Sequence, residues 1–212
     1  MGRRSDHTRA ELETLILAEG HRLMAETGSA GFSAREVAKR IGYSIGTIYN
    51  VFGSHDRLLS AINGRTFISW AAAISDRLEA AGDGDGDRIA ILVQSYFDFA
   101  ATNRNLWLAI YDHRMPPGEP FPENYVQQRR ALTSIVEGEI ARVLPPAKAS
   151  QAPPLARSLL ATVHGHCTFA LNGTFALLGE PDPQGAALAR VRESLRAAGA
   201  PGLRGPSRTP AT

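Results

Sequence analysis

The stretch from residue 31 to residue 52 constrains the fold of this 212-residue chain most, because it predicts two short helices joined by a tight turn. Ser33, followed three residues later by Glu36, is the capping-box pattern that begins a helix. Gly42 can end that helix with a positive φ, and Ser44 is the N-cap of the next one. Two helices around a glycine-containing turn make a helix-turn-helix, whose second helix suits a DNA major groove.

Helical periodicity continues along the rest of the chain, and no run alternates apolar and polar residues over strand length. We therefore predict an all-α fold of about nine helices. Besides the two short ones, helices are expected at residues 8–27, 54–81, 87–102, 106–111, 123–144, 155–178 and 182–198. The proline-rich residues 115–122 cannot be helical, and residues 145–154 are predicted to be a mobile loop, since proline fixes φ and removes a donor.

Composition predicts a cytoplasmic protein without a membrane span. The formal charge is only +2, so any basic surface for nucleic acid must be local. The single cysteine, Cys167, excludes an internal disulfide and suits a reducing compartment, and no apolar run follows Arg3 and Arg4 as in a signal peptide. Residues 158–179 carry no charge, but their histidines, asparagine and threonines are costly in hydrocarbon, which favours a helix buried in protein.

Two patterns raise the possibility of a metal site. Residues 82–87 alternate glycine and aspartate like the start of a calcium loop, yet Arg88 stands where that loop needs glycine and Gln94 where it needs glutamate. His164 and Cys167, three residues apart on one helix, can share a metal, but a third ligand is not evident. We predict neither a metal nor a cofactor.

An enzyme is the competing class of function. Ser54, His55 and Asp56 are consecutive, so they cannot form a catalytic relay. The glycines of residues 82–86 do not follow a strand and lack the Lys-Ser/Thr of a phosphate-binding loop. We therefore predict that the chain is not an enzyme.

Residues 42–59 resemble the TetR family of transcriptional regulators, whose pattern runs Gly-Val-Ser-x-Gly-Thr-Leu-Tyr-x-x-Phe-x-x-Lys-x-x-Leu. The order, the spacing and the distance from the N-terminus agree. His55 stands where the family usually has a lysine, and Ile45 occupies a turn position that is more often polar.

The C-terminal half is similar, more weakly, to a TetR-like domain named after a Trp-His-Gly motif. The resemblance covers residues 107–125, and His164-Gly165 preserves the His-Gly without the tryptophan. It implies that this half binds a small-molecule effector and forms the dimer. We therefore expect a DNA-binding domain at residues 1–53, an effector-binding and dimerisation domain at 54–199 with 54–81 as connecting helix, and a disordered tail at 200–212.

Contacts to DNA should divide into those that position the protein and those that read bases. Thr47 and Asn50 are the candidates for base edges, since a threonine methyl meets thymine and an amide pairs with adenine. The alternative is that Tyr49 is a half-buried core aromatic and Asn50 a solvated residue. The predicted DNA-binding residues are Arg3, Arg4, Ser33, Lys39, Tyr43, Ser44, Ile45, Gly46, Thr47, Tyr49, Asn50 and His55.

Aromatic side chains with a few polar groups are typical of a small-molecule site. The predicted effector-binding residues are Phe97, Trp107, Tyr111, His113, His164, Cys167, Phe169 and Asn172. The alternative is that these aromatics belong to the ordinary core. The effector is expected to be largely apolar.

Small residues such as Ala161 and Gly165 in a charge-free helix predict a homodimer through the last two helices. A two-fold dimer implies an operator that is an inverted repeat of double-stranded DNA. We predict a repressor that its effector releases from this operator. The alternative is an all-α interaction or ligand-binding module with degraded DNA binding.

Overall fold

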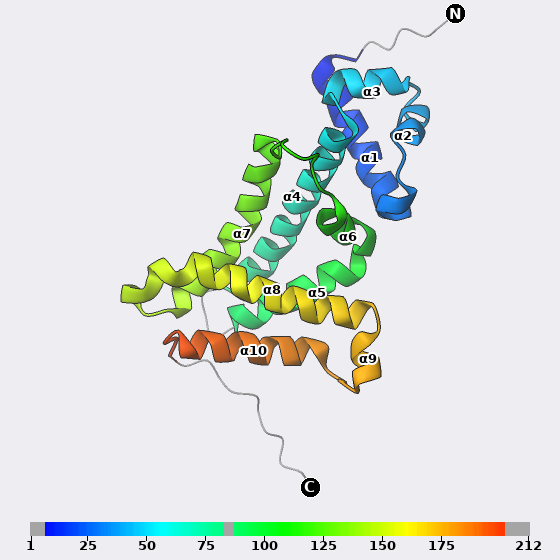
Figure 1. Cartoon of the computed structure of the whole chain (residues 1–212). Coiled ribbons are helices and arrows are strands. Elements are labelled where there is room, and N and C mark those ends of the chain that lie inside the picture. Colours follow the sequence, from blue (N-terminus) through cyan, green and yellow to red (C-terminus); the bar gives the residue numbers. More distant parts are fainter. Residues whose placement is uncertain (1–6, 83–86, 202–212) are drawn as a thin grey trace, which may run out of the picture. The chain divides into compact units, whose positions relative to one another are not determined.

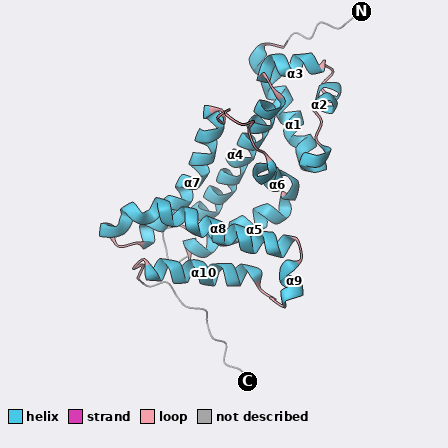
Figure 2. Ribbon diagram, viewed as in Figure 1, coloured by secondary structure: helices cyan, strands magenta, loops and turns pink. Residues whose placement is uncertain are grey.

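The computed structural model describes residues 7–82 and 87–201, and over these residues it contains ten α-helices, one 3₁₀-helix and no strand (Figures 1 and 2). The all-α prediction is confirmed. The helices are α1 (Arg9–Gly31), α2 (Ala34–Arg40), α3 (Ile45–Phe52), α4 (His55–Ala81), α5 (Arg88–Thr102), α6 (Arg104–Asp112), α7 (Glu123–Val143), the 3₁₀-helix η1 (Pro146–Gln151), α8 (Ala152–Leu171), α9 (Thr174–Leu178) and α10 (Pro183–Ala197).

The single helix expected at residues 155–178 is two helices. Gly173 breaks it with φ 80°, a left-handed conformation that glycine adopts without a Cβ penalty. Asn172 stabilises the break, because its Oδ1 accepts a hydrogen bond from the backbone N–H of Thr174 at 3.0 Å. The described residues therefore hold ten α-helices, close to the predicted number of about nine.

The loop expected at residues 145–154 was also wrong. Residues Pro146–Gln151 form η1, and α8 already begins at Ala152. Pro153 and Pro154 lie in the first turn of α8, where a backbone N–H has no acceptor within the helix. The N–H that proline lacks is therefore not needed there.

By packing, the described residues form two compact units. The first holds those up to Trp70 and Asn103–Arg130, and the second holds Ala71–Thr102 and those from Ala131 onwards. Both α4 and α7 contribute residues to each unit. The predicted division at residue 53 is a functional one and stays a prediction, and most of the predicted tail, residues 202–212, lies outside the described residues.

The first unit is built on one apolar cluster from α1, α2, α3, α4 and α6. Its buried members are Ile16, Leu23, Met24, Ala34, Val37, Ala38, Ile48, Leu58, Ile62, Leu106 and Ala109. Burial of this apolar surface holds the short α2 and α3 in place, since helices of this length are marginal alone.

In the second unit, α8 and α10 run side by side and both pack on α5 (Figure 1). Arg88 of α5 makes a bidentate ion pair with Glu139 of α7, with N–O distances of 2.6 and 2.7 Å. Arg192 of α10 pairs with Asp87. None of the helices in the described residues is long and apolar enough to cross a membrane.

Candidate nucleic-acid interface and small-molecule cavity

The start of α2 is capped as predicted, but only by half of a capping box. Ser33 Oγ accepts a hydrogen bond from the backbone N–H of Glu36 at 3.4 Å. The Glu36 carboxylate does not return to Ser33 and instead accepts a hydrogen bond from Arg40 Nε at 3.1 Å. The complete capping box lies at the start of α1, between Thr8 and Glu11, where sequence reasoning had not placed it.

The turn between α2 and α3 has the predicted geometry. Gly42 has φ 77°, and Ser44 Oγ accepts a hydrogen bond from the backbone N–H of Thr47 at 3.2 Å. The Ser44 and Thr47 hydroxyls also lie 3.0 Å apart in a hydrogen bond. The cap thus engages the Thr47 hydroxyl, and the contact of the Thr47 methyl with a base stays a prediction.

One face of α3 is buried and the opposite face is exposed. Ile48 is fully buried, whereas Gly46 and Asn50 are exposed. Ile45 and Tyr49 are half-buried and pack against the apolar cluster. The packing of Tyr49 agrees with the alternative that it is a half-buried core aromatic. The exposed position of Asn50 is compatible both with a base contact and with a solvated surface residue.

A histidine that sequence reasoning missed contacts the predicted interface. His7 Nδ1 and the Tyr43 hydroxyl lie 2.8 Å apart in a hydrogen bond, although 36 positions separate them in the chain. His7 precedes α1, so nothing in the local pattern of residues 42–59 points to it. The predicted contacts Arg3 and Arg4 lie outside the described residues.

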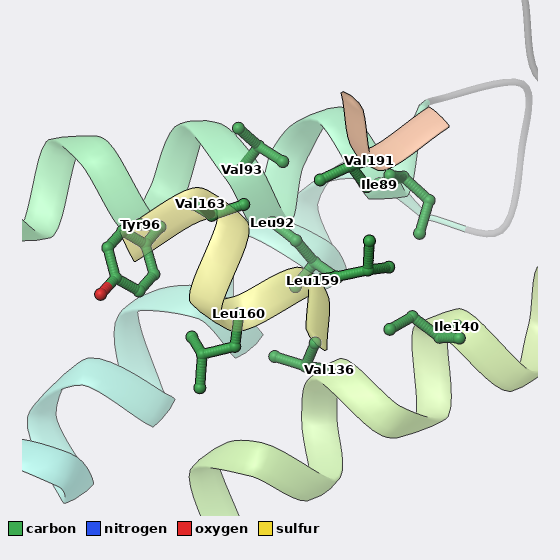
Figure 3. A pocket seen from close by; sticks show the side chains of 10 residues that line it. All are labelled: Ile89, Leu92, Val93, Tyr96, Val136, Ile140, Leu159, Leu160, Val163 and Val191. Carbon is green, nitrogen blue, oxygen red and sulfur yellow. The ribbon is translucent and has the colours of Figure 1, made fainter. Parts of the chain in front are cut away.

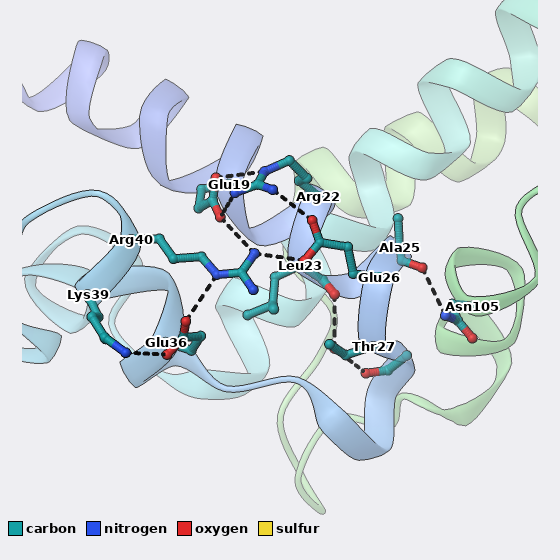
Figure 4. Close-up of polar contacts among 11 residues, drawn as sticks. Glu19, Arg22, Leu23, Ala25, Glu26, Thr27, Glu36, Lys39, Arg40 and Asn105 are labelled. Carbon is teal, nitrogen blue, oxygen red and sulfur yellow. Dashed lines mark hydrogen bonds and ion pairs between the residues drawn. The ribbon is translucent and has the colours of Figure 1, made fainter.

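Arg40 fastens α2 to α1 through what we call the Arg40 cluster, Arg40 with Glu19, Glu26 and Glu36 (Figure 4). Its Nη1 donates to Glu26 at 2.8 Å and to Glu19 at 3.3 Å. These contacts lower the pKa of the Glu26 and Glu36 carboxyls, chiefly through the hydrogen bonds from Arg40. The Arg40 guanidinium is thereby engaged by carboxylates, whereas the neighbouring Lys39 side chain is 79% exposed.

The start of α4 presents a histidine to solvent. Ser54 Oγ caps the helix by accepting a hydrogen bond from the backbone N–H of Arg57 at 3.2 Å, as predicted. His55 is exposed, and its ring lies 6.0 Å from that of Phe32, centroid to centroid. From residue 7 to residue 57 the chain holds six basic and six acidic side chains, so this part carries no net formal charge.

The second unit contains a small apolar cavity of about 50 Å³ between α5, α7, α8 and α10 (Figure 3). It is lined by Ile89, Leu92, Val93, Tyr96, Val136, Ile140, Leu159, Leu160, Val163 and Val191. Its one polar group is the Tyr96 hydroxyl, which is hydrogen-bonded to His164 Nδ1 at 2.9 Å. Ligand pockets typically measure about 300–1,000 Å³, so a ligand here would have to separate these side chains.

The predicted effector residues do not gather at this cavity. Trp107, Tyr111 and His113 belong to the first unit, and Phe97, His164, Cys167, Phe169 and Asn172 belong to the second. None of them lines the cavity, and His164 reaches it only through Tyr96. Apart from Tyr96 the lining is aliphatic, and it was missed because such residues look like ordinary core in a sequence.

Several of these residues have structural partners. Trp107 packs edge-on against Tyr111 with ring centroids 5.3 Å apart, and His113 Nε2 lies 3.2 Å from the buried Ser60 hydroxyl. Burial raises the pKa of the Cys167 thiol to about 12. Within the described ranges no group of three or more His, Cys, Asp or Glu side chains is arranged to hold a metal.

Family models match two parts of the chain. Residues 16–62 match the model described as bacterial regulatory proteins, tetR family, and residues 89–195 match the tetracyclin repressor-like C-terminal domain. The second match names this broader domain, and the finer resemblance to the Trp-His-Gly domain stays a prediction.

Individual relatives agree with these models. The HTH-type transcriptional regulator BetI of Paraburkholderia phytofirmans is 31% identical over 77% of this chain and 80% of its own length. The regulator of the same name from Burkholderia thailandensis is 30% identical over 68% of this chain and 73% of its own.

Solved structures share the fold. A protein of unknown function from Rhodococcus sp. RHA1 has a TM-score of 0.69 at 24% identity, covering 92% of this chain and 98% of that one. The multidrug binding protein EbrR, solved with imidazole, has a TM-score of 0.60 at 19% identity, covering 89% of this chain and 96% of that one.

Proposed function

Because the chain belongs to the TetR family of bacterial regulatory proteins, we propose that it is a sequence-specific DNA-binding repressor that a small-molecule effector releases from its operator. The observation that carries this proposal is the capped α3, which buries Ile48 and exposes Gly46 and Asn50 on its other face. We propose no catalytic activity and a cytoplasmic location, in keeping with action on chromosomal DNA.

In the proposed complex, α3 lies in the major groove. Asn50 contacts an adenine edge and the Thr47 methyl a thymine. Ser33, Tyr43 and the exposed Lys39 contact the phosphate backbone, which fixes the register without reading sequence. Six basic side chains lie in residues 7–57, and the salt dependence of binding should follow the number of them that contact phosphates.

In-vitro selection of DNA sequences with the purified protein, at several salt concentrations, tests this proposal. We expect an enriched inverted repeat, because a two-fold dimer presents two copies of α3. Salt-sensitive binding without an enriched sequence would contradict the repressor and favour a module with degraded DNA binding.

Two substitutions then separate reading from positioning. Asn50→Ala should weaken operator binding by about 1–3 kcal/mol and relax sequence preference at one position of each half-site. Lys39→Ala should weaken binding to all sequences alike and reduce the salt slope by about one. Asn124→Ala, at an exposed asparagine in α7, is the control and should change neither.

For the effector, we propose the cavity of the second unit as the binding site. Its aliphatic lining favours an uncharged, largely apolar compound, because a charged group would lose hydration there without a partner. The similarity in fold to EbrR, solved with imidazole and with proflavin, supports a small organic ligand.

A matched series tests the effector site: cyclohexanol, cyclohexylamine and cyclohexanecarboxylate. The neutral cyclohexanol should stabilise the protein against heat and release the operator more than the two charged compounds do. Val163→Phe, which fills the cavity, should abolish both effects. Equal effects of all three, or effects that survive Val163→Phe, would place the effector elsewhere.

A further inference from the structure

The start of α1 lies beside α3 and contacts the helix-turn-helix through two basic residues (Figure 1). Arg9 Nη2 donates a hydrogen bond to the backbone carbonyl of Val51, near the end of α3, at 3.3 Å. His7 Nδ1 and the Tyr43 hydroxyl lie 2.8 Å apart in a hydrogen bond, and the centroids of their rings are 6.2 Å apart. His7 is exposed and Tyr43 is half-buried, so this polar pair lies at the surface of the first unit.

The backbone of the turn holds Tyr43 in place. The N–H of Gly42 donates to the Lys39 carbonyl at 3.2 Å, and the N–H of Tyr43 donates to the Ala38 carbonyl at 2.9 Å. These two hydrogen bonds make the Schellman motif that ends α2, with Gly42 in the left-handed position. The next residue, Ser44, caps α3, and the N-terminal end of a helix favours an anion. Tyr43 is therefore fixed next to a helix end that suits a phosphate group.

The charged groups near His7 on its own element are Glu11 and Arg9, and the turn presents Tyr43 itself. The Glu11 carboxylate accepts hydrogen bonds from the backbone N–H and the hydroxyl of Thr8 at 2.7 and 2.9 Å. These hydrogen bonds, with a smaller contribution from the charge of His7, lower the pKa of the Glu11 carboxyl. Glu11 is thus an ionised neighbour engaged by Thr8, while His7 Nδ1 is engaged by Tyr43.

A phosphate bound at Tyr43 would decide where the proton of this hydrogen bond lies. The oxygens of a DNA phosphate only accept hydrogen bonds, so the Tyr43 hydroxyl must donate its one proton to them. His7 Nδ1 must then be the donor to the Tyr43 oxygen. A neutral imidazole can do this only as the tautomer with its proton on Nδ1, whereas an imidazolium always carries a proton there and adds a positive charge. Phosphate binding therefore favours protonated His7.

We propose that His7 and Tyr43 form one site for a DNA backbone phosphate, which takes up a proton at His7 when DNA binds. In this site Tyr43 contacts the phosphate and His7 is the positioning residue for its hydroxyl. The inference rests on the proposed function as a DNA-binding protein. Contacts to phosphates do not read sequence, so the site should act on any duplex as well as on the operator.

The dissociation constant for DNA at pH 6, 7 and 8, at constant salt, tests this with the full-length protein. Both the selected operator and a random-sequence duplex of the same length are used. Histidine ordinarily changes charge between pH 5 and 8, so binding should be tighter at pH 6 than at pH 8. We expect a difference of about threefold to tenfold per half-site, the range for one hydrogen bond.

Three variants assign this pH dependence to the pair. His7→Gln keeps a hydrogen-bond donor but gains no charge, so it should lose the part of the pH dependence that His7 supplies. Tyr43→Phe should lose the same part, because His7 acts through the hydroxyl. His7→Lys carries a charged donor throughout this range and should bind at pH 8 as tightly as the wild type does at pH 6. His166→Gln is the matched control, since His166 lies in the second unit and is hydrogen-bonded to the Thr162 carbonyl.

Each outcome decides the proposal. If His7→Gln keeps the pH dependence of the wild type, His7 takes up no proton and the proposal is wrong. If Tyr43→Phe keeps it, His7 acts by its charge alone and the shared site is wrong. The pH dependence without any enriched DNA sequence would support the phosphate site and contradict the sequence-specific repressor, whereas no binding to either duplex would overturn both.

Discussion

At the scale of single residues, three buried or half-buried histidines make stability depend on pH. Burial lowers the pKa of His21, His113 and His164, so each of them binds protons less readily in the folded chain than in the unfolded one. Around His113, Asp56 opposes this shift, while His55 and Arg114 add to it. Stability must therefore rise with pH through the ordinary histidine range of about 6.5.

We expect the melting temperature to fall as the pH is lowered from about 7 to about 5, as these histidines are forced to protonate. His113→Gln should reduce this slope while costing some stability at neutral pH, because the bond to Ser60 changes. Scanning calorimetry from pH 5 to 8 measures how the melting temperature depends on pH. A melting temperature of the wild-type chain that does not change with pH would contradict the lowered histidine pKa values. The Glu26 and Glu36 carboxyls also have lowered pKa values, but they affect stability only at more acid pH.

The second residue-scale prediction concerns Cys167, the single cysteine of the chain. It is fully buried, and a pKa raised to about 12 leaves about one thiolate in ten thousand at pH 8, against about a quarter for a free thiol. The native protein should react with a thiol reagent such as Ellman's reagent very slowly, and denaturant should release one fast equivalent. A fast equivalent without denaturant would show that α8 opens readily.

At the scale of elements, two substitutions distinguish a glycine that its backbone conformation requires from one that only lowers helix propensity. Gly28 has φ 68° and ψ 179°, which kink α1 and which alanine does not tolerate, so Gly28→Ala should destabilise the protein by about 1–3 kcal/mol. Gly138→Ala should stabilise it by about 0.5–1 kcal/mol, since Gly138 lies inside α7 and an added Cβ meets no described atom within 4 Å outside its own helix. Urea unfolding of both variants checks the opposite signs, and equal effects would mean that the kink is dispensable.

The helices themselves were largely predictable, because their caps and apolar spacing are local signals. Ser33, Ser44 and Ser54 cap the helices where the sequence placed them. Breaks and starts that depend on single backbone conformations were not predictable. Gly173 could have continued a helix at a modest cost, and Pro153 fits equally in a loop or in a first helical turn.

At the scale of the whole molecule, the predicted homodimer through α8 and α10 can be tested with matched glycines. Gly165 is exposed on α8, and an added Cβ there meets no described atom within 4 Å beyond its own helix, as at Gly138 of α7. Gly165→Glu should therefore fold but dissociate the dimer, while Gly138→Glu should not. Light scattering after size exclusion measures the mass, and a wild-type monomer, or a Gly165→Glu dimer, would contradict this interface.

The two candidate sites differ in how much of their arrangement can be predicted from the sequence. The predicted DNA-binding residues between Ser33 and His55 lie within one short stretch of chain, so one motif predicts their arrangement. The cavity draws aliphatic residues from four helices, which only tertiary packing brings together. The hydrogen bonds of His7 with Tyr43, Asn105 with Ala25 and Ser29 with Asp112 likewise join residues 36, 80 and 83 positions apart. At such separations a local pattern carries no information.

The kink at Gly28 has a consequence for genetics. Beside the kink, Asn105 donates a hydrogen bond to the Ala25 carbonyl and Ser29 donates one to Asp112. Substitutions that loosen these two hydrogen bonds touch neither the predicted DNA-contacting residues nor the cavity lining, so they should weaken repression without changing how the effector binds. A screen for derepressed promoters would then recover changes at Gly28, Ser29, Asn105 and Asp112.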